Sequence, residues 1–138
     1  MDKPKKPRWD IIGLTFALNG LRHVFIRERN LKIHIVITIL VVIAAIVFSI
    51  STTEIIILVI TVSNVIFAEI VNTAIETVVD LICIDILKDE LRSNEYNAKA
   101  KIAKDVAAGA VFVTAIMSII VGVIVFLPKI INIVASNK

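Results

Sequence analysis

The chain has 138 residues, of which 58% are hydrophobic, and its formal net charge is +3. Its length fits one domain, and its hydrophobic share exceeds that of a typical soluble domain. The small positive charge does not indicate a nucleic-acid partner; membrane topology and attraction to anionic lipid headgroups explain it better. The single cysteine, Cys83, excludes an internal disulfide and argues against a thiolate metal cluster. We therefore expect one membrane-embedded domain over residues 1–138.

Residues 8–29 have the pattern of an amphipathic helix. Apolar side chains recur at helical spacing, while Arg22, Arg27 and Arg29 take the other side. Such a helix is too polar to span a bilayer and would lie in the interface, with Trp9 at headgroup level. Two readings stay open, a simple anchor and a helix that also forms one wall of an active site.

Three apolar runs follow, at about 33–50, 55–75 and 106–127. Each approaches or exceeds the roughly 20 residues that cross a hydrocarbon core of about 30 Å. Pro128, directly after the third run, predicts that the helix ends there. The expected fold is an all-α integral membrane protein with three transmembrane helices and an N-terminal surface helix.

Basic residues are distributed unevenly between the two sides of the membrane. Residues 1–32 contain eight Lys or Arg and the connection 84–105 contains five, whereas the turn 51–54 contains none. The positive-inside rule therefore places the N-terminus and the connection 84–105 in the cytoplasm, and the C-terminus outside.

An acidic stripe interrupts the second run. On a helix, Asn72, Glu76 and Asp80 return to within about 60° of Glu69. A carboxylate at the bilayer centre costs roughly 2.5–3.5 kcal/mol, so such a residue indicates a functional site. The alternative is a polar stripe that joins helices, but a single Asn or Ser can do that without burying charge.

The stripe approaches the cytoplasmic surface, where Glu28 is also expected. At 1.5 Å per residue, Glu76 lies about 30 Å beyond Ile56, and Glu69 about 10 Å deeper than Glu76. Glu28, Glu69 and Glu76 can therefore converge in one layer. Carboxylates with an Asn oxygen at a wet interface suit a hard cation, favouring Mg²⁺ together with phosphate oxygens.

Other polar residues near this layer permit more than one interpretation. Lys99, Lys101 and Lys104 either bind a polyanion or flank the third span as the positive-inside rule requires. His23 and His34 are interpreted as isolated interfacial residues rather than ligands. Three spans scarcely enclose a site alone, so we expect a homo-oligomer with sites at subunit boundaries.

Three segments carry a family resemblance: AEIVNTAIETVVDL (68–81), GLRHVFIRERNLKIH (20–34) and AKIAKDVAAGAV (100–111). Together they resemble the prokaryotic diacylglycerol kinase/undecaprenol kinase family of small integral-membrane lipid kinases. The form ExNxxIH (28–34), the AKIAKDVAAGAV segment and FLPKI (126–130) are more similar to the undecaprenol kinase branch of Gram-positive bacteria.

The resemblance implies a homotrimer of three-span subunits in the bacterial plasma membrane, with the active site on the cytoplasmic side. It implies transfer of the γ-phosphoryl group of ATP to a lipid hydroxyl. Glu69 would be the catalytic base, and Asn72 would position the γ-phosphate or the lipid head. Further roles fall on residues at the membrane surface: Glu28 and Glu76 would hold Mg²⁺ and orient ATP, and Lys104 and Asp105 would contact the nucleotide.

The expected reaction is phosphorylation of undecaprenol to undecaprenyl phosphate, with diacylglycerol as the alternative acceptor. A proton-coupled transporter using Glu69 and a non-catalytic assembly protein are more remote alternatives. The chain departs from the family pattern at 83–97, which is about ten residues longer than usual, so Asp85 and Asp89 stay unassigned.

Overall fold

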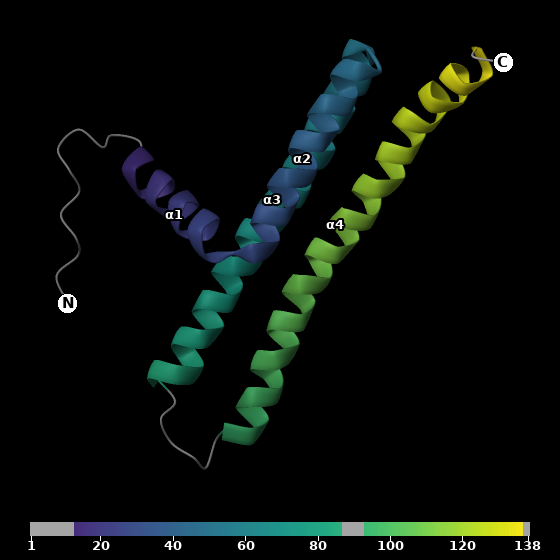
Figure 1. The fold of residues 1–138 in the computed structure, drawn as a ribbon. Helices are drawn as coiled ribbons and strands as arrows, with labels where there is room; N and C mark the ends of the chain where they lie inside the picture. The colour runs from purple at the N-terminus through teal and green to yellow at the C-terminus, as the bar shows by residue number, and fades with distance from the viewer. Residues whose placement is uncertain (1–12, 87–92, 137–138) are drawn as a thin grey trace.

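The computed structural model describes residues 13–86 and 93–136, and every regular element in these two ranges is helical. In chain order these elements are α1 (Leu14–Arg27), α2 (Arg29–Val47), α3 (Thr52–Asp80), the π-helix η1 (Leu81–Ile86) and α4 (Ser93–Ser136). Figure 1 shows α2, α3 and α4 running alongside one another, with α1 leaving them obliquely. Three helices are long and apolar enough to cross a membrane, which confirms the three predicted spans.

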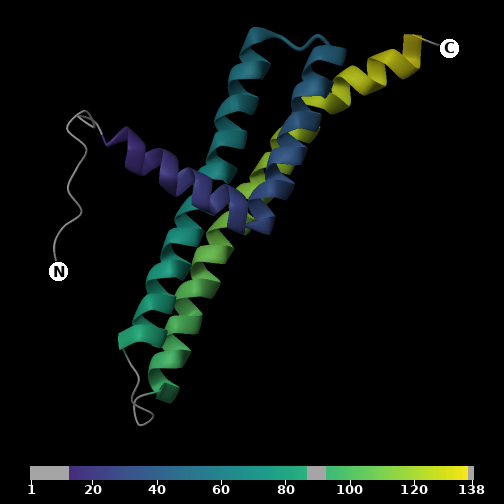
Figure 2. The same ribbon diagram turned by 60° about the vertical axis from the view of Figure 1, so that its left-hand side comes forward.

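Helix α1 is separated from α2 by a single extended residue. Gly13 precedes α1 with a φ of 68°, in the left-handed region that glycine enters at little cost. At the other end, Glu28 has φ −86° and ψ 118°, so the backbone turns before α2 begins. The break sets α1 at an angle to the long helices in both views (Figures 1 and 2). Residues 8–12, with Trp9, lie outside the described ranges, and the placement of α1 at a membrane surface stays a prediction.

A tight turn joins α2 to α3 and is capped by side chains. The Glu54 backbone N–H donates to Ser51 Oγ at 3.3 Å, and the Ser51 backbone N–H donates to Glu54 Oε2 at 2.7 Å. This reciprocal capping box satisfies two N–H groups that a helix start otherwise leaves free. Below the turn, Ile50, Leu58 and Val125 form the buried core cluster. This end of the bundle is therefore fixed by both capping and apolar packing.

The predicted end of the third span at Pro128 is wrong, because α4 continues through Pro128 to Ser136. Proline removes one N–H from the helix, but membrane helices tolerate this because local adjustment and neighbouring groups satisfy the freed backbone. Figure 2 shows the C-terminal part of α4 turning to a new direction, as a proline kink would produce.

The last part of the predicted cytoplasmic connection 84–105 is helical. Helix α4 begins at Ser93, so 93–105 belong to it. This segment is rich in Ala and Lys, which favour helix. At 1.5 Å per residue, α4 is about 66 Å long and α3 about 43 Å, whereas α2 is about 28 Å. At one end, therefore, α3 and α4 extend past α2 together.

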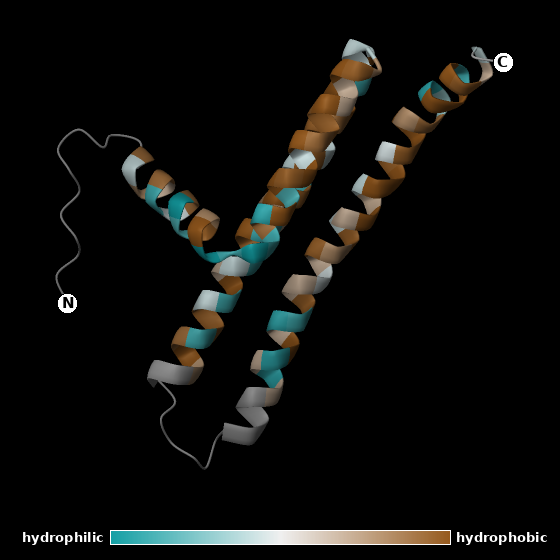
Figure 3. Cartoon of the chain, viewed as in Figure 1, coloured by the Kyte–Doolittle hydropathy of each residue, from teal (hydrophilic) through white to brown (hydrophobic). Residues whose placement is uncertain are grey.

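The surface of the chain is largely apolar. Large side chains such as Ile46, Phe67 and Ile124 are 66–73% exposed on the long helices. In Figure 3 apolar residues cover the part of the bundle near the α2–α3 turn, and polar residues gather where α1 meets α2 and on the adjoining parts of α3 and α4. Such exposure suits contact with lipid tails, and the chain is a membrane protein.

Candidate active site

Glu69 and Asn72 of the acidic stripe line a cavity of about 260 Å³ between α2, α3 and α4. Four polar residues line it, two from each of α2 and α3: Asn30, His34, Glu69 and Asn72. The rest of the lining is apolar and comes from α2 and α4: Ile33, Ala108, Val111, Phe112 and Ala115. The cavity thus combines a few convergent polar groups with apolar walls, which is typical of a small-molecule binding site.

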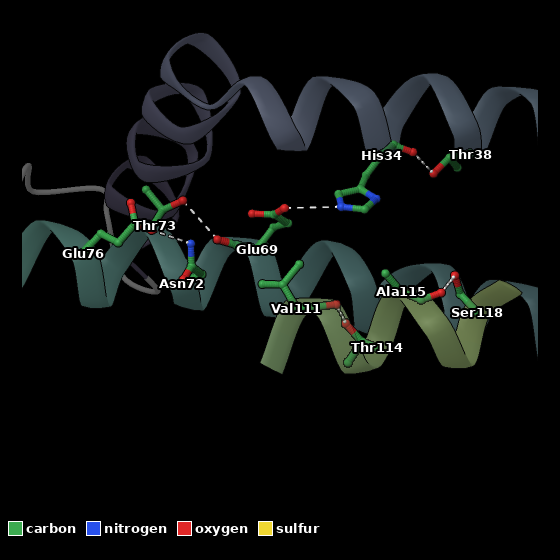
Figure 4. A network of polar contacts seen from close by, with 10 residues as sticks. All are labelled: His34, Thr38, Glu69, Asn72, Thr73, Glu76, Val111, Thr114, Ala115 and Ser118. Carbon is green, nitrogen blue, oxygen red and sulfur yellow. Dashed lines mark hydrogen bonds and ion pairs between the residues drawn. The ribbon is translucent and has the colours of Figure 1, made fainter. Parts of the chain in front are cut away.

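Glu69 is the most buried residue of the stripe, with 2% of its surface exposed. Its carboxylate Oε1 lies 3.3 Å from Nε2 of His34, which extends from α2 (Figure 4). The expectation that His34 is isolated is therefore wrong: the antiparallel packing of α2 on α3 brings it to Glu69. Its position at the membrane interface stays a prediction. His23, by contrast, is exposed on α1. The signal available in the sequence was the position of His34 inside an apolar run, one residue after the predicted start of the span at about 33.

Asn72 and Glu76 are joined one turn further along α3. Asn72 Nδ2 donates a hydrogen bond to Glu76 Oε1 at 2.9 Å. Asn72 is 8% exposed, and its carbonyl oxygen Oδ1 is buried without a hydrogen-bond partner. A buried acceptor with no donor is uncommon in a folded protein. Asn72 therefore presents an unsatisfied oxygen beside the Glu76 carboxylate, a donor set suited to a hard cation.

Glu28 contributes a third carboxylate near the stripe. It occupies the N-cap position of α2 without a side-chain capping bond and is half-buried, and Glu28 and Glu76 both lie close enough to Glu69 to repel its charge. The convergence of the three acids on one cation stays a prediction. Within 13–86 and 93–136, however, no three His, Cys, Asp or Glu side chains are grouped closely enough to hold one metal ion.

The residues present can hold Mg²⁺ only if most of its ligands come from water and substrate. Mg²⁺ usually takes one or two carboxylates and fills its remaining positions with water and substrate phosphates. Glu76, Glu28 and the unpartnered oxygen of Asn72 match that demand in type and number.

The predicted nucleotide contacts are engaged in ion pairs within the chain. Lys104 Nζ lies 2.5 Å from Asp80 Oδ1 and joins α4 to α3, and Lys101 Nζ lies 2.5 Å from Asp105 Oδ2. Lys104 also experiences the charge of Glu76, so it belongs to the same electrostatic environment as the stripe. Asp105 is exposed and is not among the residues that line the cavity.

The threonines of the stripe bond to their own helix. Thr73 Oγ1 donates to the Glu69 carbonyl at 3.0 Å, and Thr77 Oγ1 donates to the Thr73 carbonyl at 2.8 Å. The groups left to act on a ligand are therefore the Glu69 and Glu76 carboxylates, the Asn72 oxygen and the His34 ring. This set can accept a proton and bind a cation in one place, next to an apolar space.

Comparison with known proteins shows the family to which this chain belongs. The family model for prokaryotic diacylglycerol kinase matches residues 15–126. A diacylglycerol kinase of Synechocystis sp. is 32% identical over 133 residues, covering 93% of this chain and 71% of the relative. An undecaprenol kinase of Bacillus subtilis is 37% identical over 102 residues, covering 74% of this chain and 75% of the relative. No solved structure gives a significant match.

Proposed function

We propose that this chain, which belongs to the prokaryotic diacylglycerol kinase family of membrane lipid kinases, phosphorylates undecaprenol with Mg-ATP. The observation that carries the site assignment is the burial of the Glu69 carboxylate within an apolar helix. This carboxylate faces a cavity with mostly apolar walls. Burying an acid in such a place costs free energy, so its presence there indicates a functional requirement.

Glu69 is the proposed general base. It accepts the proton of the lipid hydroxyl while that oxygen bonds to the γ-phosphorus of ATP and the bond to the bridging oxygen breaks, releasing ADP. General-base assistance contributes about 10²–10⁴-fold to a rate. The burial of Glu69 among apolar side chains favours a lipid hydroxyl over water as the acceptor.

Asn72, Glu76 and Glu28 form the proposed cation and phosphate site. Glu76 and Glu28 supply carboxylates, and Asn72 offers its unpartnered oxygen to the cation or to a donor on the substrate. Bound Mg²⁺ supplies charge neutralisation on the phosphate oxygens, which phosphoryl transfer requires.

Lys104 is the proposed cation for the nucleotide. Its pairing with Asp80 holds the ammonium beside the stripe when no phosphate is near, and a phosphate can then replace the carboxylate as its partner. Asp105, held by Lys101, is proposed to contact the nucleotide as well.

The choice of undecaprenol rests on residues 28–34, 100–111 and 126–130, which resemble the undecaprenol kinase branch, and the walls of the cavity are compatible with it. Ile33, Val111 and Phe112 line the cavity with hydrocarbon, while Asn30, His34 and Asn72 supply its side-chain donors. Its polar end holds one group of side chains around Glu69, which suits a lipid whose single polar feature is a hydroxyl. A volume of about 260 Å³ accommodates the hydroxyl end, while the isoprenoid chain would extend into the bilayer.

We propose further that the protein is a homotrimer in the bacterial plasma membrane, with its N-terminus and active site on the cytoplasmic side and its C-terminus outside. The wide apolar exposure of α2, α3 and α4 leaves surface for neighbouring subunits. Crosslinking in mild detergent tests the oligomer, and a result showing only monomer contradicts it.

A competition assay tests the substrate. Purified protein in mixed micelles receives Mg-ATP with equal amounts of undecaprenol and diacylglycerol, and labelled phosphate is followed into each lipid. We expect label chiefly in undecaprenyl phosphate, with Glu69→Gln as the blank. Preference for diacylglycerol, the activity in the name of the Synechocystis relative, would overturn the choice of lipid and keep the roles of the site residues.

A further inference from the structure

We propose that His34 is a positioning residue that fixes the Glu69 carboxylate so that a single oxygen faces the acceptor hydroxyl. The proposal rests on the proposed role of Glu69 as general base. It adds to that role a residue from another helix, whose function is to orient the base rather than to touch the reacting atoms.

The contact between the two side chains joins two membrane-spanning helices. His34 Nε2 on α2 lies 3.3 Å from Glu69 Oε1 on α3, and the Glu69 side chain is 3% exposed. A carboxylate can only accept, so Nε2 carries the proton in this contact. Figure 4 shows the second oxygen of Glu69 pointing away from His34, toward the side of α3 on which Glu76 lies. His34 therefore occupies one oxygen and leaves the other for the substrate.

The backbone of His34 is fixed within helix α2. Thr38 Oγ1 donates to the His34 backbone carbonyl at 2.7 Å, which is a local bond within α2. The ring lines the same cavity as Glu69 and Asn72, and its side chain is 20% exposed. The imidazole and the Glu69 carboxylate thus lie side by side in the wall of one cavity, so a change in the shape of the ring or in its N–H directly affects Glu69.

The charges around Glu69 show why a partner is needed. Glu28, from the α1–α2 break, and Glu76, from α3 itself, both repel a negative Glu69, whereas His34 attracts it. Without His34, the repulsion of Glu76 would favour rotamers of Glu69 that turn away from the phosphate site. Because misplacement of a catalytic group by about 1 Å can cost about 10²-fold in rate, the contact bears directly on turnover.

Two substitutions distinguish the role of the His34 N–H donor from the role of its ring. His34→Phe keeps a ring of similar size and removes the N–H, whereas His34→Gln keeps an N–H donor on a side chain of similar reach. We expect His34→Phe to lower kcat for lipid phosphorylation by about ten- to a hundredfold with the KM for Mg-ATP unchanged, and His34→Gln to recover most of the loss. His23→Phe, the same change at the exposed histidine of α1, is the matched control and keeps normal kinetics.

The decisive measurement is the double variant with Glu69→Gln. If His34 acts through Glu69, then adding His34→Phe to Glu69→Gln lowers kcat no further, because residues that act as a unit are not additive. Equal losses on the wild-type and Glu69→Gln backgrounds would overturn the proposal, as would a normal kcat for His34→Phe.

Variant folding and the proposed function are checked separately. If His34→Phe does not elute as wild type in detergent, then His34→Asn, whose amide is too short to reach Oε1, takes its place beside His34→Gln. Near-normal kcat in Glu69→Gln would overturn the general-base assignment itself. Loss of activity in Glu69→Gln with no effect of His34 substitution would overturn only the inference about His34.

Discussion

The two ends of the helix bundle are built on different principles. At the α2–α3 turn, three features fix the long helices. They are the capping box, the cluster of Ile50, Leu58 and Val125, and the contact between the Phe48 and Phe126 rings, whose centroids are 5.9 Å apart. At the other end, α2 stops, α1 leaves at an angle, and α3 and α4 continue together with polar residues between them. One end satisfies its polar groups internally; the other leaves Asn72 Oδ1 unpartnered beside a cavity.

This difference places residues that stabilise the fold and residues proposed for function at opposite ends of helix α3. Helix α3 carries Glu54 at the first end, where its carboxylate completes the capping box and lies 3.3 Å from Lys129. The same helix carries Glu69 and Glu76 at the second end, where their partners are a histidine and an amide. Substitutions of the same kind at the two ends should therefore have separable effects.

The largest effect is expected for Glu69→Gln. Removal of the base should lower kcat by about 10²–10⁴-fold and leave the KM for Mg-ATP near normal, because the amide keeps the shape of the side chain and loses its ability to accept the proton. Steady-state kinetics in mixed micelles measures both constants. Glu54→Gln, the same change at the other end of α3, is the control and should not alter them.

A smaller effect on rate, joined to weaker nucleotide binding, is expected for Glu76→Gln. The glutamine can still accept the hydrogen bond from Asn72, but the charge that would hold Mg²⁺ is lost. We expect the KM for Mg-ATP to rise at least about tenfold, together with a fall in kcat. Titration of Mg²⁺ at fixed ATP checks the cause, since excess Mg²⁺ should restore part of the activity. Unchanged Mg²⁺ dependence would remove Glu76 from the cation site.

The smallest effect is expected at the capped end. Ser51→Ala removes the hydroxyl that accepts from the Glu54 N–H and should cost about 1 kcal/mol of stability. Thermal unfolding in detergent should show the loss, while kcat and KM at a permissive temperature stay normal. If Ser51→Ala instead lowered kcat, the division of the bundle into a structural end and a functional end would be wrong.

The sequence predicted the three long helices because each apolar run is by itself long enough to indicate a membrane-spanning helix. The acidic stripe was equally visible, since four polar residues at helical spacing within an apolar helix follow from the chain order. One helix end was wrong for a local reason: Pro128 was expected to end the third helix, but α4 continues through it to Ser136 among apolar residues. The predicted connection 84–105 is helical from Ser93 onward, where Ala and Lys residues favour helix.

His34 and the pairing of Lys104 show where sequence reasoning stopped. Which residue of α2 meets Glu69 depends on the break at Glu28 and on how far α2 runs back along α3, and neither follows from the spacing of apolar residues. The partner of Lys104, Asp80, is 24 residues away along the chain, so only the packing of α4 on α3 reveals it.

The amino-acid sequence by itself determined that this protein has three helices long and apolar enough to cross a membrane and that one of them carries an acidic stripe. It could do so because burial of apolar surface and helical periodicity are properties of continuous segments. The tertiary structure decided which groups face the stripe: a histidine against its deepest acid, an unsatisfied amide oxygen, and hydrocarbon walls around a small cavity. Those contacts join helices distant in the chain, and their geometry depends on the angle and register of packing.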